Sequence, residues 1–259
     1  MKNRIKKYVS MLLVTVMAAG CLFGCGSKNA ADQGSSDTSA ESEKSAKTDG
    51  GRLSIVTTIF PEYDWVKQIL GDKADDADIT MLLDNGVDLH SYQPTVDDIA
   101  KISDCDMFIY VGGESDAWVD DALKEAVNKD MKVIDLLDVL KDTIKEEEVV
   151  EGMQAEEEEE ESADGDSEEE PEYDEHVWLS LKNAKVICDA IEKDLADLDP
   201  DNADIYAKNL ENYTGQLDAL DQEYQAAVDA APQKTLLFGD RFPFRYMVDD
   251  YGLNYYAAF

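Results

Sequence analysis

The sequence predicts an α/β protein with a parallel β-sheet, and three features of its 259 residues support this fold class. Short apolar segments typical of strands alternate with helical segments of about ten residues, which is the pattern of βα units. A long amphipathic helix follows, and after it the chain begins another strand–helix–strand unit. We therefore expect one α/β lobe, a long helix and the start of a second α/β lobe.

The N-terminal lobe is expected over residues 53–200. Its predicted strands are Leu53–Thr58, Ile79–Leu83, Asp106–Val111 and Met131–Leu136. Its predicted helices are Glu62–Leu70, Val96–Ser103 and Trp118–Asn128. Because one helical segment separates each strand from the next, the strands are expected to run parallel.

Two further helices are predicted, and Pro200 separates them. The first spans about Ser180–Leu198, and the second lies within residues 201–231. The second carries apolar residues at intervals of three and four, at Tyr206, Leu210, Tyr213, Leu217, Leu220, Tyr224 and Ala227. Its length of about 26 residues exceeds the usual mean of about 11 to 12. We expect a helix that links two lobes, with a bundle helix or a coiled-coil arm as alternatives.

Residues 232–259 are expected to begin the C-terminal α/β lobe. They contain a predicted strand at Lys234–Gly239, a helix at Phe242–Tyr251 and the start of another strand at Leu253–Phe259. A unit of this size cannot bury a core of its own, since even domains of about 60 residues are marginal. The sequence is therefore interpreted as C-terminally truncated, with most of the second lobe missing.

The first 24 residues are predicted to be a secretory signal peptide. A basic head precedes an apolar run, Val9–Gly20, that is too short and too early for a mature spanning helix. The end of this segment, Leu22–Cys25, resembles the lipobox of bacterial lipoproteins. Cys25 is therefore the expected lipidation site, with Cys21 as an alternative, and an extracytoplasmic protein anchored to the cell membrane is expected.

Residues 25–52 are predicted to form a disordered tether, because they contain almost no large apolar side chains. The two remaining cysteines, Cys105 and Cys188, fall in an apolar strand and in a helix. Buried free thiols are expected at such places. A disulfide between them is the alternative.

Acidic residues dominate the chain, whose formal net charge is −36. Nucleic acids and acidic lipid surfaces are therefore not expected as partners. Residues 146–175 contain eighteen carboxylates and no Lys or Arg, so this segment is expected to stay solvated. It is either a surface loop without a task or a segment that collects cations weakly beside a cation site.

Only two histidines occur, and both lie at predicted element junctions. His90 lies in the loop between a strand and a helix that Thr95 and Asp98 open as a capping box. His176 lies between the acidic segment and a helix, and Asp240 follows the strand of the second unit. Ligands bind beyond the carboxyl ends of strands in open α/β sheets. Any one of these residues could be structural, but together they predict a metal site.

Three segments resemble motifs of the zinc and manganese substrate-binding lipoproteins of bacterial ABC transporters. Leu89–Thr95 resembles the family's His-x-Tyr-x-Pro-Thr motif. Glu175–Ser180 resembles its second motif, with Glu175 where a proline is common. Phe238–Phe244 resembles its third, although many zinc-binding members carry histidine where this chain has Asp240. The resemblance covers Leu53–Phe259, and a strand-end loop at Gly112, Gly113, Glu114 and Trp118 is also similar.

This resemblance implies two Rossmann-like lobes joined by one rigid helix, with a metal ion held in the cleft between them. His90, His176 and Asp240 are the implied metal ligands, and a further acidic ligand is expected beyond Phe259. The implied cargo is Zn²⁺, with Mn²⁺ as the alternative because Asp240 adds an oxygen ligand. The protein is expected to be a monomer that delivers the ion to an ABC transporter permease.

Other functions are less consistent with these residues. A secreted zinc hydrolase needs a general base beside an open site, yet no His-Glu-x-x-His occurs and Glu175 is the only near candidate. An acidic surface adhesin would use the lobe only as a scaffold. A sugar-binding protein could use tryptophans as stacking platforms, but Trp65 and Trp118 sit at helix positions typical of core. No enzymatic activity is therefore predicted.

Overall fold

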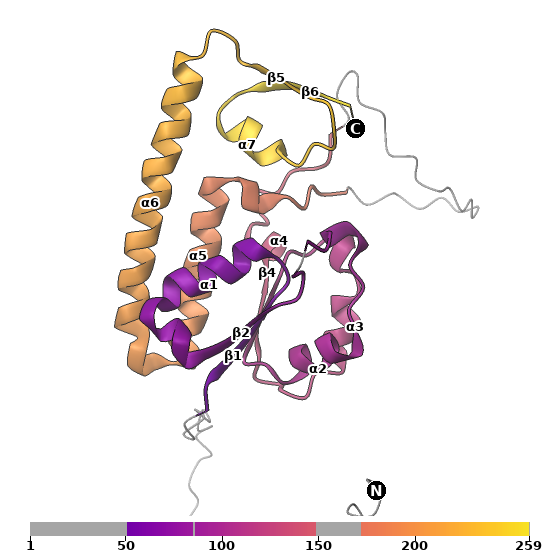
Figure 1. Cartoon of the computed structure of the whole chain (residues 1–259), viewed down its shortest axis with the longest axis vertical. Coiled ribbons are helices and arrows are strands. Elements are labelled where there is room, and N and C mark those ends of the chain that lie inside the picture. Colours follow the sequence, from indigo (N-terminus) through magenta and orange to yellow (C-terminus); the bar gives the residue numbers. More distant parts are fainter. Residues whose placement is uncertain (1–50, 85, 149–171, 259) are drawn as a thin grey trace, which may run out of the picture. The chain divides into compact units, whose positions relative to one another are not determined.

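A computed structural model describes the protein over residues 51–84, 86–148 and 172–258 (Figure 1). All of these residues belong to one structural unit, Ala46–Phe259. The predicted signal peptide, the predicted lipidation site Cys25, most of the tether and most of the acidic segment lie outside the described residues.

The N-terminal lobe is built on four parallel strands in the order β2-β1-β3-β4. These strands are β1 (Leu53–Thr57), β2 (Ala77–Met81), β3 (Met107–Tyr110) and β4 (Lys132–Asp135). The chain passes from β1 to β2 on one side of it and then crosses to form β3 on the other side of β1. Their carboxyl ends therefore define a topological switch point, where α/β sheets usually bind ligands. The predicted fold class is confirmed.

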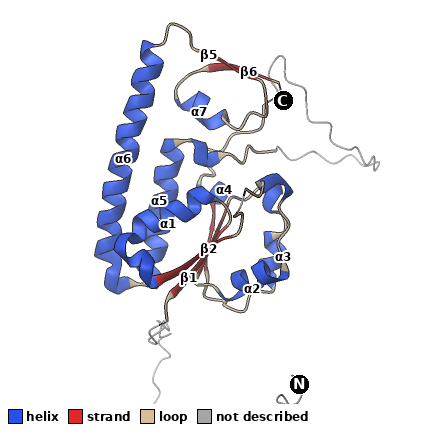
Figure 2. Ribbon diagram, viewed as in Figure 1, coloured by secondary structure: helices blue, strands red, loops and turns tan. Residues whose placement is uncertain are grey.

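Helices cover both faces of this sheet, as Figure 2 shows. On one side α1 (Phe60–Leu70), α5 (Leu181–Leu198) and α6 (Ala203–Ala230) pack against one another. On the other side lie α2 (Val96–Asp104) and α3 (Val119–Lys124), which contact each other. The short α4 (Leu136–Val139) was not predicted from the sequence. Coverage of both faces explains why the two central strands, β1 and β3, are mostly buried.

The core joins the sheet to the α1 and α5 layer. Fully buried side chains come from the two central strands and from both helices, and they include Ile55, Phe108, Ile109, Ile69, Leu70, Ile187, Ile191 and Leu195. The thiols of Cys105 and Cys188 are also buried and unpaired, which confirms the expected free cysteines. Burial raises the pKa of each thiol to about 12. Both therefore stay protonated at neutral pH in the metal-free protein.

The long helix α6 contains 28 residues and extends for about 40 Å. The sequence predicted one continuous apolar stripe along it, and of the residues in this stripe only Tyr206 and Leu217 are buried. Leu220 and Tyr224 stay 41% and 44% exposed, because the second half of α6 runs beyond α1 and α5 (Figure 1). Within the described residues, no helix is long and apolar enough to cross a membrane.

After α6, the chain forms a two-stranded parallel sheet from β5 (Thr235–Phe238) and β6 (Asn254–Ala257), connected by α7 (Arg245–Asp250). Tyr224 of α6 stacks on Tyr251 with ring centroids 5.6 Å apart. The long helix therefore contacts the N-terminal lobe through its first half and this second unit through its last turns.

Two predicted helices are shorter than expected, each for a local reason. The helix predicted to reach Asn128 ends at Lys124, because the backbone N–H groups of Val127 and Asn128 donate to the Ser103 carbonyl instead. The helix predicted from Phe242 begins at Arg245, because Pro243 disfavours helical backbone at the residue before it. Phe242 instead stacks on Tyr255 at a centroid distance of 3.9 Å.

Candidate metal centre

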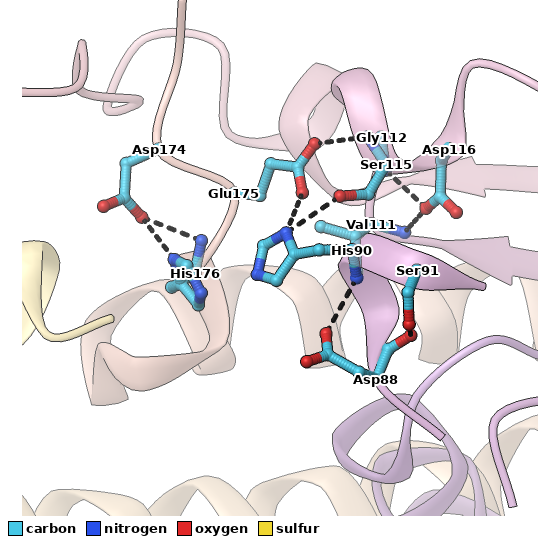
Figure 3. A network of polar contacts seen from close by, with 10 residues as sticks. All are labelled: Asp88, His90, Ser91, Val111, Gly112, Ser115, Asp116, Asp174, Glu175 and His176. Carbon is cyan, nitrogen blue, oxygen red and sulfur yellow. Dashed lines mark hydrogen bonds and ion pairs between the residues drawn. The ribbon is translucent and has the colours of Figure 1, made fainter. Parts of the chain in front are cut away.

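The two histidines lie next to each other beyond the carboxyl ends of the first sheet. His90 belongs to the short 3₁₀ helix Leu89–Ser91, which follows β2, and His176 immediately precedes the 3₁₀ helix Val177–Leu179. Their ring centroids are 5.3 Å apart, with an interplanar angle of 54° (Figure 3). The fold therefore joins two imidazoles that are far apart in the sequence.

His90 is held by contacts of its backbone N–H and of its ring nitrogen Nδ1. Its backbone N–H donates to Asp88 Oδ1 at 3.0 Å, and its Nδ1 lies 3.1 Å from Ser115 Oγ. Nδ1 is also 3.7 Å from Glu175 Oε2, as the dashed lines of Figure 3 show. The buried side chain of Leu89 anchors the turn that carries the ring. The His90 side chain itself is 40% exposed, so an ion can reach it.

His176 is held in a similar way by Asp174. Its backbone N–H and its Nδ1 lie 2.8 Å and 3.2 Å from Asp174 Oδ1. The backbone carbonyl of Asp174 accepts a hydrogen bond from the Tyr246 hydroxyl of α7 at 2.8 Å. The ring of Trp178 lies against the imidazole, with centroids 5.3 Å apart. Helix α7, which connects β5 and β6, thus supports the segment that carries His176.

Both imidazoles use Nδ1 for these contacts, and neither Nε2 has a hydrogen-bond partner among the described residues. Metal-binding histidines commonly bind the ion through one nitrogen and donate the other N–H to a carboxylate or carbonyl. The geometry therefore leaves two lone pairs for a cation in the partly open space beside the rings.

Two aspartates that hold the backbone at the histidines were not predicted from the sequence. Asp88 and Asp174 each stand two residues before a histidine, and each accepts that histidine's backbone N–H. Aspartate commonly bonds the backbone two residues on in this way. The repeated Asp-x-His spacing is a signal that could have identified both.

Glu175 corrects the prediction that residues 146–175 stay solvated. It is only 7% exposed, and its Oε1 accepts the backbone N–H of Ser115 at 2.8 Å. Asp174 is buried as well, and Glu146 and Tyr173 form an antiparallel bridge just outside it. The prediction was wrong at Asp174 and Glu175. The distant Ser115 N–H offsets the loss of water at Glu175, and the neighbouring His176 N–H offsets it at Asp174.

The loop after β3 carries a second buried carboxyl group next to this one. Asp116 Oδ2 accepts the backbone N–H groups of Val111 and Gly112 at 3.0 Å and 3.1 Å. Burial raises the pKa of Asp116 to about 6, the nearby charge of Glu175 adds to the rise, and the two backbone donors oppose it. In the first turn of α1, burial likewise raises the pKa of Glu62, although the backbone N–H groups of Ile59 and Thr58 oppose the rise.

Asp116→Asn is expected to flatten the pH dependence of stability. The folded-state pKa of Asp116 lies above its unfolded value, so between pH about 4 and 6 the unfolded chain releases a proton that the folded protein keeps. The free energy of unfolding of the unaltered protein therefore falls as pH rises through this window. Over this window the free energy of unfolding of the unaltered protein should fall by up to about 2 kcal/mol more than that of Asp116→Asn. Urea unfolding of both proteins at pH 4.5 and 6.5 measures it, and parallel losses in both would contradict the assignment.

Asp240, the third predicted ligand, lies elsewhere. It is exposed in the loop after β5, and its Oδ1 accepts the backbone N–H of Arg241 at 2.9 Å. Over residues 51–84, 86–148 and 172–258, no group of three or more His, Cys, Asp or Glu side chains is close enough to hold a metal ion. The structure therefore brings His90 and His176 together and leaves Asp240 apart from them.

Comparison with known proteins also indicates metal binding. The family described as zinc-uptake complex component A, periplasmic, matches residues 55–259. The high-affinity zinc uptake system protein ZnuA of Bacillus subtilis is 35% identical over 210 residues, which cover 81% of this chain and 62% of that protein. The zinc-binding lipoprotein AdcA of Streptococcus pneumoniae is 33% identical over 208 residues, covering 80% of this chain and 39% of AdcA.

Solved structures of metal-binding proteins have a similar fold. The Zn(II)-bound ZnuA-like domain of S. pneumoniae AdcA aligns with a TM-score of 0.60 and 29% identity, over 80% of this chain and 67% of that one. The metal-dependent lipoprotein YcdH of B. subtilis aligns with a TM-score of 0.63 and 28% identity, over 79% and 66%. The chain spans about two fifths of the length of the AdcA proteins it matches.

Proposed function

Because the chain belongs to the family of the periplasmic zinc-uptake component A, we propose that it captures Zn²⁺ outside the cytoplasm and delivers it to an ABC transporter permease. In this role the ion is cargo, and the protein needs a site that binds it tightly without performing chemistry on it. A closed set of protein ligands serves this purpose, whereas a catalytic zinc keeps a position open for water.

The neighbouring pair of imidazoles carries this proposal. His90 and His176 lie with ring centroids 5.3 Å apart, and both have Nδ1 anchored and Nε2 without a partner among the described residues. Neutral imidazole is a good ligand for Zn²⁺, at about 2.0 to 2.1 Å. Two rings already oriented in this way lose little further entropy when the ion arrives.

Asp240 is the proposed third ligand. It lies on the loop after β5, in the unit that α6 connects to the N-terminal lobe. Because Asp240 lies apart from the two histidines in this structure, completing the coordination of an ion held by them requires this loop to move toward the pair. Zinc is the proposed cargo rather than manganese, because two nitrogen ligands suit Zn²⁺ while Mn²⁺ prefers more oxygen. The relatives named above as zinc-binding proteins support the same choice.

The proposed location is the outer face of the cell membrane, with the chain anchored by lipid on Cys25. The expected partner is therefore a membrane permease, reached by a monomer on its tether. The name of the S. pneumoniae relative, a zinc-binding lipoprotein, supports this arrangement.

Titration of the full-length, chelator-stripped protein tests the proposal. We expect one tight Zn²⁺ site and much weaker binding of Mn²⁺ by calorimetry. The site should survive deletion of residues 149–171, because the ligands lie outside that range. Zinc at 100 times its dissociation constant should also raise the free energy of unfolding by about 2.7 kcal/mol. Only weak, multiple sites that disappear with residues 149–171 would contradict a site at the histidines.

A further inference from the structure

Glu175 presents a buried carboxylate oxygen that the fold leaves without a hydrogen bond. Oε1 accepts the Ser115 backbone N–H at 2.8 Å, whereas Oε2 is buried with no hydrogen-bond partner and lies 3.7 Å from His90 Nδ1. A buried polar atom without a partner costs free energy, so each such atom in a folded protein calls for a reason.

The surrounding loop holds this carboxylate tightly in place. Gly113 has a φ of 78°, and a Cβ atom on it would lie 2.4 Å from Glu175 Oε1. Only glycine lets the backbone approach so closely. The side chain therefore has one oxygen fixed on Ser115 and the other directed to the imidazole of His90 (Figure 3).

Metal binding changes what His90 needs from its surroundings. An imidazole that binds Zn²⁺ through Nε2 must carry its proton on Nδ1, and the bound cation makes that N–H a stronger donor. A charged acceptor forms a shorter and stronger hydrogen bond with such a donor than a neutral one, especially away from water. Ser115 Oγ, 3.1 Å from Nδ1, is the neutral alternative in this site.

We propose that Glu175 is a positioning residue that accepts the Nδ1–H of His90 and thereby directs the Nε2 lone pair to the metal ion. The proposal rests on the proposed function, because it treats His90 as a zinc ligand. Proline is common at this position in the family that the motif resembles, so the device belongs to this chain rather than to the shared site. Carboxylate partners of metal-bound histidines raise affinity by about 10- to 100-fold.

Glu175→Gln tests the role of the charge with little change in shape. We expect its Zn²⁺ affinity, measured by competition with a chromophoric chelator, to fall by about 10- to 100-fold. Glu62→Gln is the matched control, since Glu62 is fully buried and, among the described residues, its carboxylate accepts hydrogen bonds only from Thr58 and Ile59. The Zn²⁺ affinity of Glu62→Gln should change by less than about threefold. Ser115→Ala should lose less Zn²⁺ affinity than Glu175→Gln.

Nitrogen-15 NMR of the His90 ring provides a readout that a merely structural role would not move. The metal-free and zinc-loaded protein should both show the Nδ1–H tautomer, with its proton shifted downfield on zinc binding and less so in Glu175→Gln. An unchanged affinity in Glu175→Gln, or a larger loss in Ser115→Ala, would overturn the proposal. An Nε2–H tautomer in the metal-free protein would also overturn it, and this result does not require any variant to fold.

These outcomes separate the positioning role from the function itself. If the unaltered protein binds no zinc, the proposed function fails, while the tautomer of His90 in the metal-free protein still decides the role of Glu175. If zinc binds through His90 but Glu175→Gln binds it equally well, the function stands and the positioning role is wrong.

Discussion

His90→Ala is expected to weaken Zn²⁺ binding by more than about 100-fold. Loss of a residue that only orients a metal ligand costs about 10- to 100-fold, and loss of the ligand itself should cost more. The variant removes one of the two rings whose centroids lie 5.3 Å apart, and it leaves the buried Leu89 beside it intact. Chelator competition measures the change, and His176→Ala should behave in the same way.

Ser91→Ala is the matched control for this experiment. Ser91 follows His90 in the same 3₁₀ turn, is exposed, and its hydroxyl donates a hydrogen bond to the Asp88 carbonyl at 3.4 Å, its only hydrogen bond among the described residues. The zinc affinity of Ser91→Ala should stay within about twofold of the unaltered protein, because the lost hydrogen bond involves neither imidazole. Equal affinities in Ser91→Ala and His90→Ala would place the zinc somewhere other than the histidine pair.

Gly113→Ala is expected to reduce the free energy of unfolding by about 2.5 to 6 kcal/mol. The residue has a φ of 78° and a ψ of −164°, a conformation that costs a residue other than glycine about 1 to 3 kcal/mol, and the new Cβ would lie 2.4 Å from Glu175 Oε1. Glu175 must then move and release the Ser115 N–H, a bond to a charged group worth about 1.5 to 3 kcal/mol. Zinc affinity should fall as well, because the carboxylate leaves His90.

Gly215→Ala should change the free energy of unfolding in the opposite direction. Gly215 lies inside α6, and a Cβ on it would meet nothing within 4 Å. Alanine in a helix is favoured over glycine by about 0.5 to 1 kcal/mol, so this variant should be slightly more stable, with unaltered zinc binding. Urea unfolding of both variants measures the difference, and a Gly113→Ala protein as stable as the unaltered one would refute the packing described for Glu175.

The order of elements could be predicted from local pattern, because each strand and helix carries its own periodicity. The strand order β2-β1-β3-β4 could not, since it depends on which apolar faces pack together after the chain folds. Helix ends were predicted less well where a distant residue competes for the backbone. Ser103, which takes the N–H groups of Val127 and Asn128, is one such case.

The candidate site shows the same division between local and distant information. The positions of His90 and His176 at element junctions follow from neighbouring residues, and the fold brings the two rings together. The burial of Glu175 could not be read from its surroundings, because eighteen carboxylates within thirty residues predict a solvated segment. Its partners, Ser115 and His90, come from loops that only the folded sheet places beside it.

The proposed zinc site is tested most directly by an anomalous difference map, recorded at the zinc absorption edge, from crystals of the full-length protein loaded with Zn²⁺. We predict one strong peak about 2.0 to 2.1 Å from Nε2 of both His90 and His176, with Nδ1 of each ring still directed at its carboxylate partner. A peak bound through Nδ1, or one located away from the two histidines, would contradict it.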